Sequence, residues 1–488
     1  MSSPPTTTPT DISDGANSPH VLVFPYPAQG HMLPLLDLTH HLVLRGATAT
    51  IIITPKNLPF LRPLLSTHPQ SVHPLVLPFP SHPHIPPGVE NVKDIGNSGN
   101  PAIISALHSL SLPITQWFSS HPSPPSALLS DFFLGWTLHL AARLAIPRIA
   151  FYSSGAFLAS INHHLWPNLH LLNNNNNSPA VLLLSFPHLP YSPSFPRSHL
   201  PSLLLRHADP SDSDPIQAVF VKDSMLANAS SWGVVFNSFD AVEAPFLDHV
   251  RKELRHARVW AVGPIPVHSG GSSERGGPSS ASASDVLNWL DNCSIDGSVV
   301  YACFGSQVVL TRRQVEALGE GLERSGARFI LVMKPSDEEV GQVLRGLEDR
   351  VVGRGLVITG WAPQVEILSH RAVGGFVTHC GWNSVLEGLV GGVVLLAWPM
   401  EADQFVNAKL LVEYLRVGVV VCEGRESVPD SDELSLCVAE LMGEGGSEIR
   451  VRAMKLREEA VEGAKGRGNS ARDFDRLVEA LRELHPKK

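Results

Sequence analysis

The sequence predicts an α/β protein of two domains, each built on a parallel, doubly wound sheet. Short apolar, β-branched runs alternate with stretches of helical periodicity along the chain, as is typical of parallel sheets flanked by helices. The length of 488 residues favours two domains over one. A flexible Gly/Ser-rich stretch at residues 267–285 marks the neighbourhood of the junction.

The first domain is expected over residues 19–256, behind a disordered polar tail at residues 1–18. After its first strand, a helix-like run begins at Met32, and Gly46 stops it. Because the later strands also alternate with helical stretches, they should lie parallel in one sheet. The strands are expected at residues 20–24, 47–54, 126–130, 148–152 and 233–237.

The first half of the chain is poor in lysine and rich in proline, histidine and leucine. Only Lys56, Lys93 and Lys222 precede residue 250. Such a composition suits apolar, Pro-bent loops around a cleft for an apolar ligand. An asparagine run at 173–177 and an acidic stretch at 209–214 are expected to be surface loops. The acidic stretch contains an Asp-x-Asp triplet, which holds a metal in some enzymes, but no apolar strand precedes it, so a solvated loop is expected.

The second domain is expected over residues 257–469, with an apolar strand at 298–304. A helix at 311–324 and a strand at 328–332 follow. The last helix, from about residue 470, carries an apolar stripe that must pack on another element. The stripe consists of Phe474, Leu477, Val478, Leu481 and Leu484.

Composition excludes several classes of protein. The net charge of −9 argues against nucleic acid or an anionic membrane as the main partner. No apolar run reaches the roughly 20 residues that span a bilayer, and the N-terminus lacks the apolar core of a signal peptide. The five cysteines form no CxxC pair, so neither a disulfide framework nor a zinc site is expected. We expect a soluble, cytoplasmic monomer.

The most informative stretch of the chain is residues 361–404. In it a β-branched run at 375–379 leads through the sequence His-Cys-Gly-Trp-Asn-Ser into a helix at 384–389. Such a turn aims backbone N–H groups and a helix N-terminus at one point, which suits phosphate. Trp361 opens the stretch, and an Asp-Gln pair closes it. A flat surface, an anion site and partners for hydroxyl groups together suit a nucleotide-sugar.

This stretch resembles the signature box of the plant-type family 1 glycosyltransferases, which move a sugar from a UDP-sugar onto small molecules. A long, interrupted pattern of this kind is far more specific than a lone Gly-rich turn. The matching residues are Trp361, Pro363, Gln364, His379, Cys380, Gly381, Trp382, Asn383, Ser384, Glu387, Pro399, Asp403 and Gln404. The resemblance implies the GT-B architecture, with two facing Rossmann-like domains. It also implies that the terminal helix at 470–488 packs back on the first domain.

His31 and Asp131 are the candidate catalytic residues. Both follow strands of the first sheet, at the edge where open α/β sheets bind ligands. An imidazole can act as a general base near neutral pH, and a carboxylate can fix its tautomer. The motif Pro-x-Pro-Ala-Gln-Gly-His before His31 and the run Phe-Phe-Leu-Gly-Trp after Asp131 also resemble the family. The alternatives are an ordinary turn histidine and a helix N-cap.

The resemblance further implies a set of residues that bind the UDP-sugar. They are Trp361 and Ala362 for the uracil; Gln364 and Glu387 for the ribose; His379, Asn383 and Ser384 for the diphosphate; and Trp382, Asp403 and Gln404 for the sugar. Ser306, which follows Gly305 at another strand end, is a second candidate for phosphate. Ser384 and Glu387 also fit a capping box, Ser-x-x-Glu, at the start of a helix.

The function implied is inverting transfer of a sugar without a metal or other cofactor. His31 would take a proton from an acceptor hydroxyl, whose oxygen attacks the anomeric carbon as UDP leaves. UDP-glucose is the expected donor, because a closing glutamine such as Gln404 goes with glucose in the family, and UDP-xylose is the nearest competitor. The expected acceptor is a planar phenol, such as a flavonoid or a hydroxybenzoate.

Two alternatives remain: C-glycosylation of an electron-rich ring, and a non-catalytic nucleotide-sugar binder. A dehydrogenase is disfavoured, because no GxGxxG follows the first strand. Three positions depart from the family pattern. Val394 stands where proline is common, Leu331 where tryptophan is frequent, and Glu401 where a small residue is common. Of these, Glu401 adds a negative charge near the sugar end.

Overall fold

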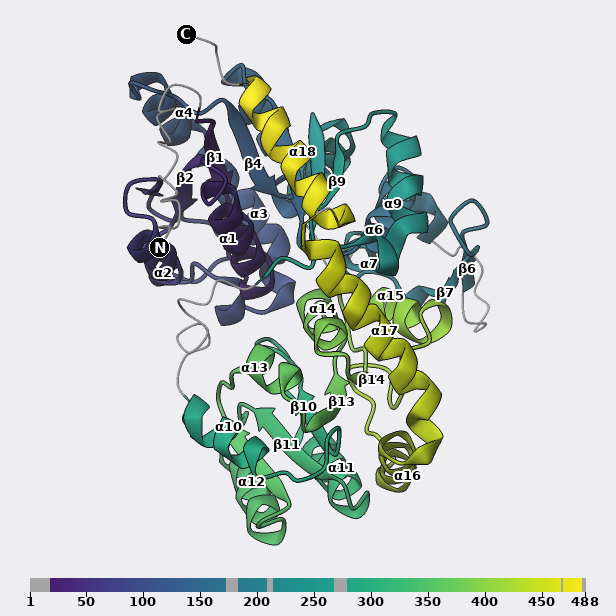
Figure 1. The fold of residues 1–488 in the computed structure, drawn as a ribbon. Coiled ribbons are helices and arrows are strands. Elements are labelled where there is room, and N and C mark those ends of the chain that lie inside the picture. Colours follow the sequence, from purple (N-terminus) through teal and green to yellow (C-terminus); the bar gives the residue numbers. More distant parts are fainter. Residues whose placement is uncertain (1–17, 173–182, 209–213, 267–278, 467, 485–488) are drawn as a thin grey trace, which may run out of the picture.

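The computed structural model describes residues 18–172, 183–208, 214–266, 279–466 and 468–484 (Figure 1). The fold is the α/β arrangement that the sequence predicts, with two parallel sheets flanked by helices. Several expected loops fall largely outside the described residues. These are the tail at 1–18, the asparagine run at 173–177, the acidic loop before Asp214 and most of the stretch 267–285.

The first sheet has seven parallel strands in the order β3-β2-β1-β4-β5-β8-β9. The strands are His20–Phe24 (β1), Thr48–Ile53 (β2), Val72–Val76 (β3), Ala127–Asp131 (β4), Arg148–Tyr152 (β5), Gly233–Phe236 (β8) and Val259–Ala261 (β9). The strand order reverses between β1 and β4, which pair with Val21 opposite Ala127. At such a switch point the carboxyl ends of adjacent strands frame a crevice for ligands.

The second sheet has six parallel strands in the order β12-β11-β10-β13-β14-β15. The strands are Val299–Cys303 (β10), Arg328–Met333 (β11), Gly355–Thr359 (β12), Val373–Thr378 (β13), Val394–Ala397 (β14) and Gly418–Val420 (β15). The switch point of this sheet lies between β10 and β13, which pair with Tyr301 opposite Phe376. Leu331 and Val394, two of the positions that depart from the family pattern, are buried strand residues of this domain's core.

Helices cover both sheets, and a short hairpin of Leu183–Ser185 (β6) and Ser194–Pro196 (β7) projects at one side (Figure 1). The helices of the first domain are Gln29–Val43 (α1), Arg62–Thr67 (α2), Asn100–His108 (α3), Ser111–Ser120 (α4), Thr137–Arg143 (α5), Ala156–Leu165 (α6), Ser202–Ala208 (α7), Pro215–Ala227 (α8) and Asp240–Leu254 (α9). Those that follow are Ala283–Asp291 (α10), Arg312–Arg324 (α11), Glu338–Arg350 (α12), Gln364–Ser369 (α13), Trp382–Gly391 (α14), Gln404–Lys409 (α15), Ser431–Met442 (α16), Ser447–Ala464 (α17) and Asn469–Leu484 (α18).

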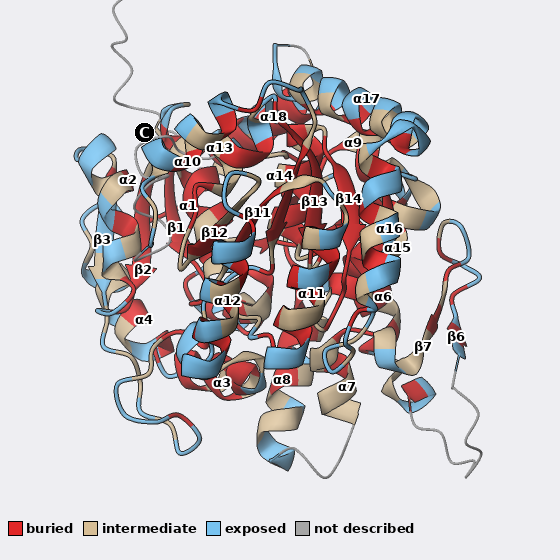
Figure 2. Ribbon diagram, turned by 90° about the horizontal axis from the view of Figure 1, so that it is seen from below, coloured by how far each residue is buried: buried red, intermediate tan, exposed pale blue. Residues whose placement is uncertain are grey.

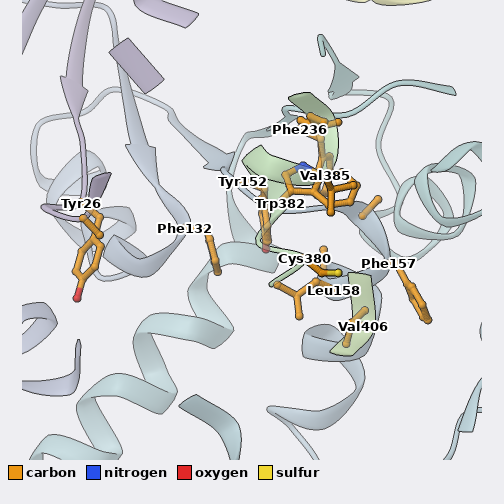
Figure 3. Close-up of a cluster of buried hydrophobic side chains, with 14 of the residues drawn as sticks. Tyr26, Phe132, Tyr152, Phe157, Leu158, Phe236, Cys380, Trp382, Val385 and Val406 are labelled. Atoms are coloured by element: carbon orange, nitrogen blue, oxygen red, sulfur yellow. The ribbon is translucent and has the colours of Figure 1, made fainter. Parts of the chain in front are cut away.

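One hydrophobic cluster spans the two domains, and each domain has a further cluster of its own. The central strands of both sheets are buried, whereas the edge strand β3 and the outer helix faces are largely exposed (Figure 2). Trp382, the first residue of α14, belongs to the same buried cluster as Tyr152 and Phe236 of the first sheet (Figure 3). Its indole N–H donates to the carbonyl of Asn237 at 2.7 Å, across the domain boundary. Packing and a hydrogen bond of Trp382 therefore join the two domains.

The terminal helix α18 follows α17 across the domain boundary and lies against the first sheet (Figure 1). Phe474, Leu477 and Leu481 are buried in the same cluster as β1. The carboxylate of Asp473 accepts the backbone N–H of Ala261, in β9, at 2.9 Å. The apolar stripe recognised in the sequence thus finds its partner on the first domain.

Candidate active site

His31 and Asp131 meet at the carboxyl edge of the first sheet. His31 lies in the first turn of α1, directly after β1, because this helix begins at Gln29 rather than near Met32. Asp131 ends the neighbouring strand β4. Nδ1 of His31 lies 3.0 Å from Oδ2 and 3.1 Å from Oδ1 of Asp131. Asp131 is fully buried, while the His31 side chain is 21% exposed, so Nε2 is the ring nitrogen left for a substrate.

Asp131 also caps the 3₁₀ turn formed by Phe132–Leu134. Its Oδ1 accepts the backbone N–H of Phe133 at 2.8 Å. The N-cap alternative is therefore true, and it does not compete with the contact to His31. The rings of Phe132 and Phe133 lie 5.5 Å and 4.6 Å from the His31 ring, centroid to centroid. Capping and aromatic packing together fix the orientation of this pair.

A buried arginine supports Asp131 through its backbone carbonyl. Arg148 is 1% exposed, and its guanidinium donates to the carbonyl of Asp131 at 3.2 Å and to Oγ of Ser130 at 2.9 Å. It also donates to Oδ1 of Asn228 and to Oγ of Ser231. Burial lowers the pKa of Arg148 to about 10, which leaves it charged at neutral pH and favourable for the Asp131 carboxylate. The sequence around Arg148 does not indicate that it supports Asp131, because its partners Asn228 and Ser231 lie far along the chain.

His379 and Ser306 follow β13 and β10, the two strands at the switch point of the second sheet. Two glycines make room for the His379 ring. A β-carbon at Gly381 would lie 2.5 Å from Nε2, and one at Gly305 would lie 3.0 Å from Cε1. Burial lowers the pKa of His379 to about 4, so the unliganded ring is neutral at pH 7. Nδ1 is buried without a hydrogen-bond partner among the described residues.

Ser384 does not cap α14, so the capping-box alternative is wrong. The helix begins at Trp382 with Gly381 as its N-cap, which places Ser384 inside the first turn. Gln364 connects the two members of the supposed box. Its Nε2 donates to Oγ of Ser384 at 3.2 Å and to Oε2 of Glu387 at 2.7 Å. Three of the residues assigned to the donor thus form one hydrogen-bonded group.

Asp403 and Gln404 differ in the freedom of their side chains. Oε1 of Gln404 accepts the backbone N–H groups of Met400 and Glu401, at 2.9 Å and 3.0 Å, so only the amide Nε2 is left to donate. Oδ2 of Asp403 accepts from Nδ2 of Asn407 at 2.8 Å. Burial raises the pKa of Asp403, and the bond from Asn407 and the nearby His31 partly offset this rise. Asp403, which is assigned to the sugar, therefore lies near the imidazole of His31.

One cavity of about 310 Å³ between the domains brings most of these residues together. The candidates that line it are His31, Ser306, His379, Trp382, Asn383, Ser384, Asp403 and Gln404. The other candidates lie outside this lining: Asp131 behind His31, Gln364 and Glu387 behind Ser384, and Trp361 and Ala362 in the segment after β12. The His31 imidazole of the first domain and a set of polar side chains of the second thus line one space.

Known proteins resemble this chain over nearly its whole length. Flavonol 3-O-glucosyltransferase UGT89B1 of Arabidopsis thaliana is 49% identical over 484 residues, which cover 97% of this chain and 99% of that protein. The chain belongs to the UDP-glycosyltransferase family. The sequence family described as UDP-glucoronosyl and UDP-glucosyl transferase matches residues 277–425 of this glycosyltransferase. The family suggested by residues 361–404 is therefore confirmed.

Solved structures confirm the GT-B fold. UGT89C1 of Arabidopsis thaliana, complexed with UDP-L-rhamnose, is 40% identical with a TM-score of 0.78, over 96% of this chain and 99% of that one. The same protein complexed with quercetin is 39% identical with a TM-score of 0.75, over 95% and 99% of the two chains. The present glycosyltransferase is an enzyme that transfers a sugar from a UDP-sugar to a small acceptor.

The glycosyltransferase also joins its domains through polar contacts beside the cavity. Nδ2 of Asn383 donates to the carbonyl of Gly30, next to His31, at 2.9 Å. Nδ2 of Asn97 donates to Oε1 of Glu401 at 2.7 Å, and Arg425 donates to Oε2 of the same carboxylate at 2.7 Å. Both oxygens of Glu401 are thus engaged, and Arg425 compensates the charge that the sequence places at the sugar end. The sequence around Asn97 and Arg425 does not indicate that they bind Glu401, because Glu401 lies in another segment of the chain.

Three further findings concern membrane spans, metal sites and cysteines. In the described part of the chain, none of the helices combines the length and apolarity that a membrane span needs. The same residues contain no group of three or more His, Cys, Asp or Glu side chains arranged to hold a metal ion. All five cysteines are free thiols.

Proposed function

We propose that the glycosyltransferase acts by a single inverting displacement with His31 as the general base. Nε2 of His31 would take the proton of the acceptor hydroxyl while its oxygen attacks the anomeric carbon. Asp131 would hold the tautomer through Nδ1 and stabilise the imidazolium as it forms. The observation that carries this proposal is the 3.0 Å contact between His31 and Asp131 at the rim of the cavity.

The leaving diphosphate would be bound on the second domain. His379, Ser306, Ser384 and Asn383 offer hydrogen-bond donors there, and the N-terminus of α14 adds its positive dipole end. Donors fixed before the reaction stabilise charge as it develops on the leaving oxygen. The scheme uses no metal. Trp361 would stack on the uracil, with Ala362 at its edge and Gln364 and Glu387 at the ribose.

UDP-glucose is the proposed donor. With Oε1 held by two backbone N–H groups, Gln404 presents Nε2 to one sugar hydroxyl, and Asp403 can accept from a neighbouring one. A site built to pair particular hydroxyls rejects sugars that leave its groups unmatched. Competition among UDP-glucose, UDP-xylose and UDP-L-rhamnose for one acceptor should give the highest kcat/KM for UDP-glucose. A higher value for another sugar would overturn the role given to Gln404.

The proposed acceptor is a planar phenol of the flavonoid type. Aromatic and apolar side chains, among them Phe132, Phe133, Leu158 and Leu204, line the first-domain side of the cavity. The flavonol glucosyltransferase relative and the quercetin complex of another support this class of acceptor. C-glycosylation of an electron-rich ring is the alternative product of the same site.

Incubation with UDP-glucose and quercetin, followed by mass spectrometry, tests the proposed function. The expected product is a hexoside that acid hydrolyses, because an O-glycosidic bond is cleaved by acid whereas a C-glycosidic bond resists it. An acid-resistant product would indicate C-glycosylation. Binding of UDP-glucose without transfer to any of a panel of phenols would indicate a non-catalytic binder. That the chain acts as a cytoplasmic monomer also remains a proposal.

A further inference from the structure

Asn162 is a buried amide in a mostly apolar wall of the cavity. It lines the cavity and is 7% exposed. Its carboxamide makes no hydrogen bond to any other residue that the structure describes. The other buried asparagine of the lining, Asn100, differs, because its Oδ1 accepts the hydroxyl of Tyr26 at 2.6 Å. The Asn162 amide is thus available to a ligand in the cavity, and a ligand that pairs with it is favoured over one that does not.

The amide lies in the middle of a stripe on helix α6. Leu158, Asn162 and Trp166 are four residues apart, so they share one face, and all three line the cavity. Leu158 and the Trp166 ring flank the amide on either side, and Nε1 of Trp166 is a second donor, buried without a partner among the described residues. Such a wall fits an aromatic surface that carries a hydrogen-bonding group at one place.

Helix α6 is held in a fixed position by a second buried group. The carboxylate of Glu243 accepts the backbone N–H groups of Ala156 and Phe157 at 2.8 Å each. A β-carbon at Gly155 would lie 2.5 Å from this carboxylate, so the helix and Glu243 are in close contact. The amide of Asn162 is therefore presented by a rigid element, which lowers the entropy cost of binding.

The amide is remote from the hydroxyl that receives the sugar. His31 follows β1 and α6 follows β5, and these strands are separated by β4. Two strand spacings are roughly 10 Å, the span of a two- or three-ring aromatic molecule. Leu158 lies near Val406 of the donor-binding domain (Figure 3), and Asn162 lies about 6 Å further along the helix. One planar molecule can therefore reach His31 and Asn162 with different groups.

We propose that Asn162 hydrogen-bonds a second polar group of the acceptor, distinct from the hydroxyl that is glycosylated. This inference rests on the proposed transfer to phenols and narrows the acceptor class. Polycyclic phenols that carry a further hydroxyl or carbonyl group are favoured over those with a single hydroxyl. The carboxamide can serve either group, since it both donates and accepts.

A comparison of two acceptors tests this role. The kcat/KM values for quercetin, which has several hydroxyls and a carbonyl, and for 2-naphthol, which has one hydroxyl, are measured with the wild type and with Asn162→Leu. Loss of a hydrogen bond at a polar site should lower kcat/KM for quercetin by about 10- to 100-fold. The value for 2-naphthol should change by less than about threefold, since its one hydroxyl receives the sugar and no polar group of it reaches residue 162 in either protein. The Kd for UDP, measured by calorimetry, should stay the same.

Asn168→Leu is the matched control. Asn168 lies shortly after α6, outside the lining of the cavity, and donates to the carbonyl of His164. This variant should leave the ratio of the two kcat/KM values unchanged. If Asn162→Leu does not bind UDP, Asn162→Ala replaces it in the comparison. Equal losses for both acceptors, or no loss for quercetin, would overturn the role of Asn162. A wild type that uses neither phenol would instead overturn the proposed function on which it rests.

Discussion

At the residue scale, the end of the cavity assigned to the sugar contains an amide of fixed orientation, that of Gln404, and a buried carboxylate, that of Asp403. Gln404 is fixed by two backbone hydrogen bonds, so its orientation is set before the sugar arrives. The pKa of Asp403 is raised, mainly by burial, so the folded protein tolerates its charge less well than the unfolded chain does. A buried carboxylate whose charge destabilises the fold is expected where the residue is retained for function rather than for stability.

Asp403→Asn should therefore separate stability from activity. Removing a carboxylate whose folded-state pKa is raised removes a cost present at neutral pH, so the Tm of the unliganded enzyme should rise or stay unchanged. The kcat/KM for UDP-glucose should fall by about tenfold or more, because a neutral amide accepts a weaker hydrogen bond. Thermal unfolding and steady-state kinetics check the two effects. A lower Tm with normal kcat/KM would contradict the assignment of Asp403 to the sugar.

At the scale of elements, helix α6 depends on one buried side chain outside the cavity. Glu243 accepts two N–H groups of α6 and the hydroxyl of Ser238 at 2.6 Å. Burial is the largest cause of its raised pKa, and the three hydrogen bonds act against it. The Glu243 carboxylate thus accepts free N–H groups at the N-terminus of α6, a helix that lines the cavity.

Glu243→Ala should lower the free energy of unfolding by about 3 kcal/mol or more, because three buried donors lose their acceptor. Glu243→Gln keeps one acceptor oxygen and should cost less. Urea unfolding of the two variants gives the comparison. The control is Asp248→Ala, an exposed residue of α9, the helix that carries Glu243. An alanine variant as stable as the wild type would show that α6 needs no such support.

How far the sequence predicts these elements depends on the range of the interactions that fix them. The strands β1 and β5 have the predicted bounds, because each is a continuous apolar run. The start of α14 lies two residues earlier than expected, because backbone geometry at Gly381, not a serine side chain, begins the helix. The pair His31 and Asp131 was predictable from strand ends. The supports Arg148 and Glu243 were not, because their partners become neighbours only through the tertiary fold.

At the scale of the whole molecule, many histidines are neutral because they are partly buried. Desolvation is the largest cause of a lowered pKa in each of them. They are His82, His108, His164, His199, His207, His256 and His379. Three carboxylates, Glu243, Asp403 and Asp473, have raised pKa values and act in the opposite direction. More groups therefore gain a proton on unfolding in weak acid than lose one.

Stability should therefore fall as the pH drops from about 7 to about 5. The unfolded chain takes up protons at histidines near pH 6.5, whereas the folded chain does so only at lower pH. Each additional proton bound by the unfolded state contributes a slope of about 1.4 kcal/mol per pH unit. Urea midpoints at pH 7.5 and 5.5 measure the effect. A midpoint that is equal or higher at pH 5.5 would mean that the buried carboxylates dominate.

The most direct test of the account is the dependence of His31→Ala on the acidity of the acceptor. If His31 is the general base, the variant should lose about 100-fold or more in turnover on a weakly acidic phenol such as 2-naphthol. On a strongly acidic nitrophenol, which ionises without help, the loss should be much smaller, and the Kd for UDP should be unchanged in both cases. The same loss on both acceptors, or near-normal turnover on 2-naphthol, would contradict a mechanism in which His31 removes the proton.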